Sequence, residues 1–270
     1  MTTMPVIVGT DGSAGSMRAV EWAAKEVRLR GAPLRIVSAA EAVTRDAQGS
    51  LEAAARRAAE IAPDMAIDTG LLAGPTAVAV AVAGCGAGAQ LLVVGTRGGG
   101  AFTAMVLGSV SRYAAMHAEC PVVVVREETM AAHRQVVVGI RDAGDCDAAL
   151  TFAFEEAGMR KASLLAVHAW QSPVSFSDLA ADEAAVPSPH AAEVKATMAL
   201  ATLLAAWQAK YPDVIVDQDV VQGHPGRVLA GYSARADLVV LGRRGEHGVR
   251  KVTHAVLSHA HGPVATVPSA

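Results

Sequence analysis

The chain has 270 residues, of which 52% are hydrophobic and 18% charged, and its formal net charge is -3. That length allows two domains, each large enough to bury its own core. The charge balance provides no basic surface for nucleic acid, and no apolar run reaches the ~20 residues that a membrane span needs, so we expect neither as a partner.

The cysteine content indicates a reducing compartment. Cys85, Cys120 and Cys146 are odd in number and lack CxxC spacing, so a disulfide framework is not expected. The chain opens directly into strand-like residues 6–8 with no signal-peptide pattern. We therefore expect a cytoplasmic protein in which Cys85 and Cys120, set among alanine and glycine, are small buried residues.

The first segment predicts a strand, a turn and a helix. Residues 6–8 form a β-branched run, and residues 9–13 (Gly-Thr-Asp-Gly-Ser) have the composition of a turn. Apolar positions on one face predict a helix over about residues 16–30 that ends at Gly31. A second strand is expected at residues 34–39.

The segment after residue 90 predicts a binding site for phosphate. An apolar strand ends at Gly95, a glycine-rich loop follows, and a helix is expected to begin at Gly108-Ser109. A helix start presents free N–H groups and a positive dipole end, and glycines let these groups approach a polyanion. Ser109 and Ser111 could cap the helix or donate hydroxyls. The loop is not a Walker loop, because no Gly-Lys-Ser/Thr follows.

After a valine strand at residues 122–125, the chain repeats the same order of elements. We therefore predict one domain written twice, as residues 1–128 and 134–270, joined near residues 127–134. The matching segments are 5–9 with 136–139, 34–39 with 164–169, 91–98 with 238–245, and 117–122 with 259–264.

Within each copy, continuous apolar strands alternate with helical segments, which is typical of a parallel sheet buried on both faces. The predicted fold class is α/β, with two tandem copies of a five-stranded, doubly wound, Rossmann-like parallel sheet. Ligands of such sheets bind at the carboxyl ends of the strands. Asp11, Ala39 and Gly95 all fall at such ends, which predicts a site there.

Three segments together resemble the universal stress protein family. They are the Gly95-x2-Gly98-x9-Gly108-Ser109 pattern, residues 9–13 after the opening strand, and the closing Cys-Pro-Val-Val-Val at residues 120–124. The tandem form of the family would cover essentially the whole chain. The resemblance implies an ATP-binding domain of the adenine nucleotide alpha hydrolase-like type, usually dimeric, that acts in stress or dormancy responses with little fast chemistry.

The resemblance also implies the nucleotide contacts. Asp11 resembles the acidic contact and could accept hydrogen bonds from ribose or help hold Mg²⁺; alternatively, it only caps the next helix. Ala39 resembles the position whose backbone meets the adenine edge, and Arg97 could reach a phosphate or face solvent. The other positions that resemble ribose and phosphate contacts are Gly9, Val94, Gly95, Gly98, Gly108, Ser109, Val110 and Ser111.

The second copy departs from this pattern. Arg141 stands where the first copy has Asp11, and Arg250-Lys251 lie opposite Gly108-Ser109. The loop before residue 250 has four residues where the first copy has nine. These changes predict a degenerate nucleotide site that serves mainly in packing and dimerisation, although its basic residues could still attract an anion.

Several other features resemble functional groups. His254, His259 and His261 lack the i, i+4 spacing of helical metal sites, and His117 matches His259, so we expect a shared role in packing or at a helix end. Phe102 and Met105 could cover the nucleotide or merely anchor their loop. Residues 171–190 are expected to form a surface loop.

The primary functional hypothesis is regulatory ATP binding with at most slow hydrolysis, since no P-loop lysine or arranged general base is visible. Two alternatives remain. One is a ligand-free scaffold that self-associates through residues 122–125 and 264–267. The other is an adenylating or ATP pyrophosphatase-type enzyme, for which residues 9–13 are too sparse a phosphate loop.

Overall fold

The computed structural model describes residues 4–40, 45–73, 88–96, 107–126, 132–141, 146–171, 188–243 and 247–269. The strands are β1 (Val6–Gly9), β2 (Leu34–Ala40), β3 (Ile67–Ala73), β4 (Leu91–Gly95), β5 (Val122–Val125), β6 (Gln135–Gly139), β7 (Ser163–Trp170), β8 (Val216–Gln222), β9 (Leu238–Arg243) and β10 (Val264–Pro268). The helices are α1 (Ala14–Arg30), α2 (Arg45–Ile61), α4 (Ser109–His117), α5 (Asp147–Arg160), α6 (Pro189–Lys210), α7 (Pro225–Tyr232) and α8 (His247–His259).

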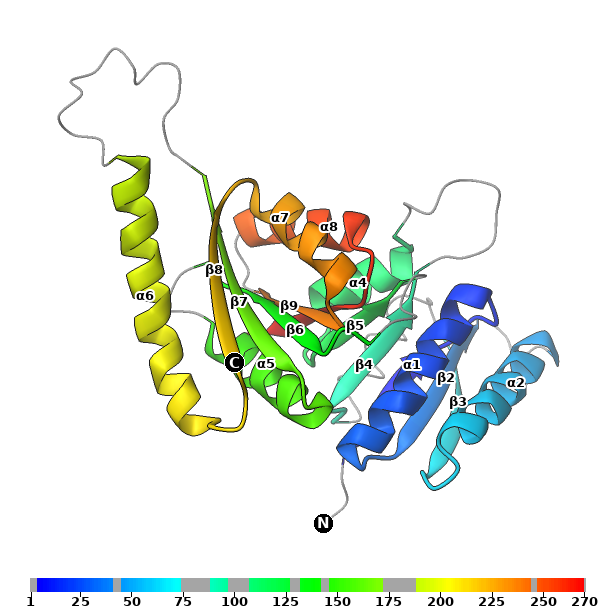
Figure 1. Ribbon diagram of the computed structural model, residues 1–270. Coiled ribbons are helices and arrows are strands. Elements are labelled where there is room, and N and C mark those ends of the chain that lie inside the picture. Colours follow the sequence, from blue (N-terminus) through cyan, green and yellow to red (C-terminus); the bar gives the residue numbers. More distant parts are fainter. Residues whose placement is uncertain are drawn as a thin grey trace.

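A single sheet of ten strands runs through the molecule in the order β3-β2-β1-β4-β5-β10-β9-β6-β7-β8 (Figure 1). Each half contributes five parallel strands, which confirms the predicted fold class of two tandem doubly wound sheets. The halves meet where β5 and β10 pair antiparallel, with Val124 opposite Val264. The two valine strands that suggested self-association therefore pair with each other inside one chain.

The register of the strands confirms that the repeat seen in the sequence is a structural repeat. Gly9 lies beside Val37 in the first half, and Gly139 lies beside Val167 in the second. Strand β4 pairs with β1 as β9 pairs with β6. The paired residues of these strands therefore have counterparts in the other half, which allows the strand ends of the two halves to be compared position by position.

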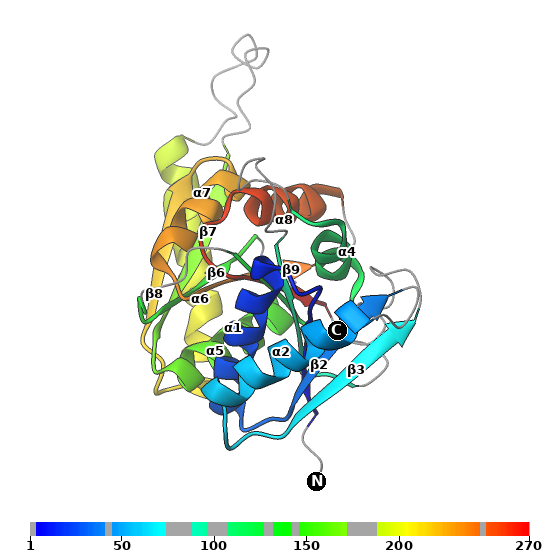
Figure 2. The same cartoon turned by 90° about the vertical axis from the view of Figure 1, so that its right-hand side faces the viewer.

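Helices cover both faces of the sheet and bury two cores. One core packs α1, α2, α5 and α6 against the sheet, and the other packs α4, α7 and α8 (Figure 2). Side chains alternate between them along each strand, so that Val6 and Val8 enter the first core and Ile7 the second. No helix among the described residues is both long and apolar enough to cross a bilayer.

The helix ends agree with most of the local predictions. Helix α1 begins slightly before the expected residue 16, and it ends as predicted at Gly31, whose φ of 60° favours glycine. The Nδ1 atoms of His117 and His259 lie 3.0 and 2.8 Å from the carbonyl oxygens four residues earlier, which confirms a shared helix-end role. His261, however, lies beyond the end of α8. Cys120 is buried as expected, and Cys85 lies outside the described residues.

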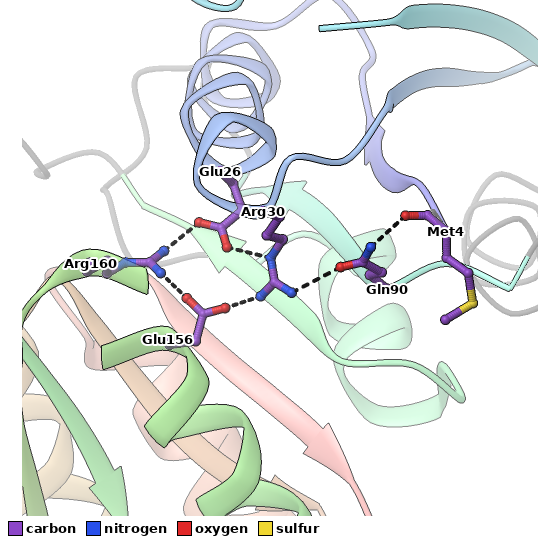
Figure 3. Close-up of polar contacts among 6 residues, drawn as sticks. All are labelled: Met4, Glu26, Arg30, Gln90, Glu156 and Arg160. Carbon is purple, nitrogen blue, oxygen red and sulfur yellow. Dashed lines mark hydrogen bonds and ion pairs between the residues drawn. The ribbon is translucent and has the colours of Figure 1, made fainter. Parts of the chain in front are cut away.

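Four charged side chains form a closed ring where α1 of the first half meets α5 of the second (Figure 3). Glu26 accepts from Arg30 Nε at 2.6 Å and from Arg160 at 2.5 Å, and Glu156 pairs with both of these arginines as well. The glutamate side chains are at most 1% exposed and the arginines 9% and 11%, so the ring is almost dry. Each charge thus has two opposite neighbours.

The ring has further contacts and an unusual acid. The guanidinium of Arg30 lies 5.6 Å from the Phe152 ring centroid. Burial, helped by the nearby charge of Glu26, raises the pKa of Glu156 to about 7, although the two arginines oppose this rise. The ring therefore links the two halves. Burying its charges costs desolvation free energy, and the attraction between them offsets this cost only while all four side chains are paired.

Candidate nucleotide site

A cavity of about 250 Å³ opens at the carboxyl ends of β1, β2 and β4, between the first turns of α1 and α4. Every predicted site residue that the structure describes lines this cavity. These residues are Gly9, Asp11, Ala39, Val94, Gly95, Gly108, Ser109, Val110 and Ser111. Arg97 and Gly98, together with the proposed lid residues Phe102 and Met105, lie outside the described residues.

Gly95 allows the two helix starts to converge on the end of β4. A Cβ atom at this position would lie 2.3 Å from the carbonyl oxygen of Gly15 in α1, which no side chain can tolerate without backbone movement. The Ser111 hydroxyl donates a hydrogen bond to the Gly95 carbonyl and so attaches α4 to the same point. A close backbone approach therefore requires the glycine, and the serine links the start of α4 to the end of β4.

The start of α4 presents amide donors to the cavity. Its N-cap is Gly108, which has no side chain to cap the helix, and the first bond of the turn runs from Arg112 N to Gly108 O at 2.9 Å. The N–H groups of residues 109–111 therefore have no acceptor inside the helix. With the positive end of the helix dipole, they make this edge of the cavity attractive to an anion.

Asp11 also lines the cavity, in a turn held by hydrogen bonds. Its Oδ1 accepts from Ser13 N at 3.0 Å, and Ser13 rather than Asp11 is the N-cap of α1, accepting from Ser16 N. Partial burial raises the pKa of Asp11, but hydrogen bonds from Ser13 and Ser16 outweigh this effect and hold it below its ordinary value of 3.8. The carboxylate is therefore ionised at neutral pH and exposed beside the cavity.

Four polar residues that the sequence interpretation did not assign to the site also line the cavity, namely Thr10, Ser13, Ser16 and Thr96. Thr10 and Ser16 join their hydroxyls at 3.1 Å, and the Ser16 hydroxyl also accepts from Asp11 N at 3.3 Å. Thr10 and Thr96 each follow directly after a central strand, and this position was a signal that could have identified both. Ser16 could not be found in this way, since only the turn of α1 brings it back to the strand end.

The described lining has the donors for an adenine nucleotide and one candidate ligand for a metal ion. Small residues at Ala39 and Gly9 leave room for a planar base beside the strand ends, and hydroxyls line the cavity at the starts of both α1 and α4. Asp11 is the only charged side chain among the described lining residues. A divalent ion held with a nucleotide's phosphates would have this carboxylate as its protein ligand in the described part of the site.

Comparison with known proteins identifies the family. The universal stress protein family model matches residues 2–84, 86–126 and 132–268. Universal stress protein Rv2623 of Mycobacterium tuberculosis is 33% identical over 272 residues, covering 92% of this chain and 89% of that protein. A universal stress protein from Archaeoglobus fulgidus shares the fold at a TM-score of 0.70 and 16% identity, covering 99% of this chain and 97% of its own. A universal stress protein solved in complex with cAMP is 30% identical, with a TM-score of 0.40, and covers 47% of this chain and 98% of its own. The chain belongs to the universal stress protein family, in its tandem form.

Proposed function

We propose that the first half binds ATP in the cavity between β1, β4 and α4, and that the bound nucleotide acts as a regulatory state in a stress or dormancy response. The observation that carries this proposal is the convergence of free amides at residues 109–111 with Asp11 and Ala39 on one cavity. The base lies against Ala39 and the phosphates lie at the start of α4. Asp11 contacts the ribose or a magnesium ion beside the phosphates.

The chemistry of the described lining supports the part of the proposal that any hydrolysis is slow. A general base works best when its pKa is close to the working pH, whereas hydrogen bonding lowers the pKa of Asp11. Rapid phosphoryl transfer also needs several positive charges around the leaving phosphate, and the described lining residues include neither lysine nor arginine. The site is suited to holding a nucleotide rather than consuming it.

Ser109 offers a direct test by calorimetry. Ser109→Glu places a negative charge in the first turn of α4, which favours the helix but repels phosphate. We expect a loss of at least tenfold in Mg·ATP affinity and a much smaller change for adenosine. Lys251→Glu is the matched control, because Lys251 holds the corresponding exposed place on α8 of the second half. Equal ATP affinity of wild type and Ser109→Glu would refute the site.

The pairing of the valine strands bears on the scaffold alternative. Residues 122–125 and 264–267 were the candidate surfaces for self-association, and β5 and β10 use these edges within one chain. We retain a homodimer and a cytoplasmic location in the proposal. The homodimer must form through a surface other than these two strand edges. Sedimentation of the purified protein with and without Mg·ATP tests the dimer. Pyrophosphate release would instead indicate an adenylating enzyme.

A further inference from the structure

Helices α4 and α8 each end against the other half of the chain. Strands β5 and β10 pair antiparallel with Val123 opposite Ala265, and these two residues are also counterparts in the sequence repeat. An approximate two-fold axis therefore relates the halves at this point. The axis makes the last turns of α4 and α8 equivalent, so that Ala115 corresponds to Leu257, and contacts across the junction can be compared in pairs.

The last turn of α4 accepts hydrogen bonds from the second half. The Thr266 hydroxyl in β10 donates to the carbonyl of Ala115 at 3.0 Å, and the Arg243 guanidinium at the end of β9 donates to the carbonyl of Ala118. Carbonyls in the last turn of a helix have no donor within that helix. A cation at this end also complements the helix dipole, so both contacts stabilise α4.

The reciprocal contact on α8 uses different residues. The carbonyl of Leu257, the counterpart of Ala115, accepts a hydrogen bond from the Arg126 guanidinium at 2.5 Å. The counterpart of Thr266 in the first half is Val124, which has no hydroxyl. Each half therefore holds the helix of the other through its own side chains, and a contact removed on one side has a matched control on the opposite side.

Helix α4 connects this junction to the nucleotide cavity. Its nine residues span about 14 Å, and the free amides at its start line the cavity. A helix this short is not stable alone in water, so its position depends on tertiary contacts. Ser111 attaches its start to Gly95, and Thr266 and Arg243 attach its end to the second half. The phosphate donors of the first half are thus carried by a helix that both halves hold.

Arg243 also lines a second cavity. This cavity has a volume of about 140 Å³ and lies at the carboxyl ends of β6, β7 and β9. It corresponds in place to the nucleotide cavity of the first half, since Gly139 and Val167 pair as Gly9 and Val37 do. Arg243 therefore lies between the strand ends of the second half and the helix that carries the free amides of the first.

We propose that Thr266 and Arg243 are positioning residues for the nucleotide site of the first half, and that the second half controls nucleotide affinity through α4. The inference rests on the proposed function, because it concerns the same free amides at residues 109–111. While the last turn of α4 is held, these amides are already ordered when the phosphates arrive. When the last turn is released, part of the binding free energy goes into ordering α4. Affinity for phosphate then falls, while affinity for the nucleoside does not.

Thr266→Val tests the buried hydroxyl with little change in side-chain shape, and it reproduces the residue that the first half has at Val124. Calorimetry should show Mg·ATP affinity lowered by about threefold to tenfold, as for the loss of one hydrogen bond, while adenosine affinity changes less than about twofold. Thr266→Ser keeps the hydroxyl and should bind Mg·ATP as the wild type does. Arg243→Met should resemble Thr266→Val, and Arg243→Lys, which keeps a donor and the charge, should recover most of the loss.

Arg126→Met is the matched control, because it removes the equivalent contact on α8. It should leave Mg·ATP affinity within about twofold of the wild type, although it weakens the same junction. Hydrogen exchange of the nucleotide-free proteins gives a measurement that does not depend on ATP. Amides of residues 112–117 should exchange at least about threefold faster in Thr266→Val than in the wild type, and Arg126→Met should instead affect residues 251–259.

Three results would overturn the inference. They are unchanged Mg·ATP affinity in both Thr266→Val and Arg243→Met, an equal loss of affinity in Arg126→Met, and a loss of adenosine affinity as large as that of Mg·ATP. Circular dichroism shows whether each variant is folded, and the Arg243 variants decide the question if Thr266→Val is not. A wild type that binds no Mg·ATP would refute the proposed function and with it the control of affinity. Exchange of the α4 amides would still show whether the second half positions this helix.

Discussion

Removal of one arginine from the buried ring should destabilise the whole chain. In Arg160→Met, Glu26 and Glu156 would share the single cation Arg30, and one buried carboxylate would lose its compensation. Methionine keeps most of the aliphatic stem of Arg160 but removes the guanidinium, whose carbon lies 5.7 Å from the Trp22 ring centroid. The variant therefore removes the charge and its contacts while it keeps much of the volume of the side chain.

The expected cost follows from burial. Breaking a buried ion pair by removing one partner typically costs about 3–5 kcal/mol, because the remaining charge has neither water nor a counterion. An exposed pair contributes about 1 kcal/mol or less. Arg57 is the matched control, since it also bridges two glutamates, Glu21 at 2.7 Å and Glu60 at 2.8 Å, but its side chain is 44% exposed.

Urea unfolding at pH 7.5, followed by circular dichroism, measures both variants. Arg160→Met should lower the free energy of unfolding by about 3–5 kcal/mol, and Arg57→Met by about 1 kcal/mol or less. Adding Glu156→Gln to Arg160→Met restores charge balance and should recover at least about 2 kcal/mol, which a double-mutant cycle reports as coupling. A cost for Arg160→Met no greater than that for Arg57→Met would refute the reasoning.

Three further predictions concern pH, close packing and helix ends. Because the folded-state pKa of Glu156 is raised to about 7, the native state binds this proton more tightly than the unfolded chain does. The free energy of unfolding should therefore fall as the pH rises from 4.5 to 7, relative to that of Glu156→Gln. Urea titrations should show a fall of at most about 1.4 kcal/mol per pH unit. Gly95→Ala should cost about 1–3 kcal/mol by thermal unfolding, whereas Gly242→Ala, whose Cβ would meet Ala149 Cβ at an ordinary 3.5 Å, should cost much less; equal effects would contradict the packing argument. Lys161 ends α5 at φ 52°, as Gly31 ends α1 at φ 60°, so Lys161→Gly should stabilise the protein by about 0.5–1 kcal/mol in urea, and a loss of stability would show that its side chain outweighs the backbone strain.

The sequence predicted the site best where a position accepts only one type of residue for a physical reason. A glycine at residue 95 before a glycine-rich loop and a helix start predicted a phosphate site, and the structure places Gly95 in the cavity lining, close to the first turn of α1. Strands β3 and β8 were expected only as members of a five-stranded set, because polar residues such as Asp217 and Asp219 interrupt their apolar pattern. Both strands lie at the edges of the sheet, where one side needs no partner strand and polar side chains are tolerated.

The joining of the halves into one sheet could not be read from local patterns. A valine run predicts a buried strand whether its partner is another strand of the same half, the other half or another chain. In the structure β5 has β4 of its own half on one side and β10 of the other half on the other. Such pairing depends on residues far apart in the chain, and strand propensity contains no information about which distant partner is chosen.

The repeat itself contains a signal for the contact between the halves. Both copies place a glutamate four residues before an arginine on the helix that follows the first strand, as Glu26 with Arg30 and Glu156 with Arg160. A ring made of two such pairs is charge-balanced only if both copies keep both residues, because one loss leaves a buried charge unpaired. The cavities have no such dependence, and there Thr10 has become Ile140 while the fold is unchanged. Identity between repeats at buried charged positions therefore indicates an interface, whereas residues at the strand ends can diverge between the copies without unpairing a buried charge.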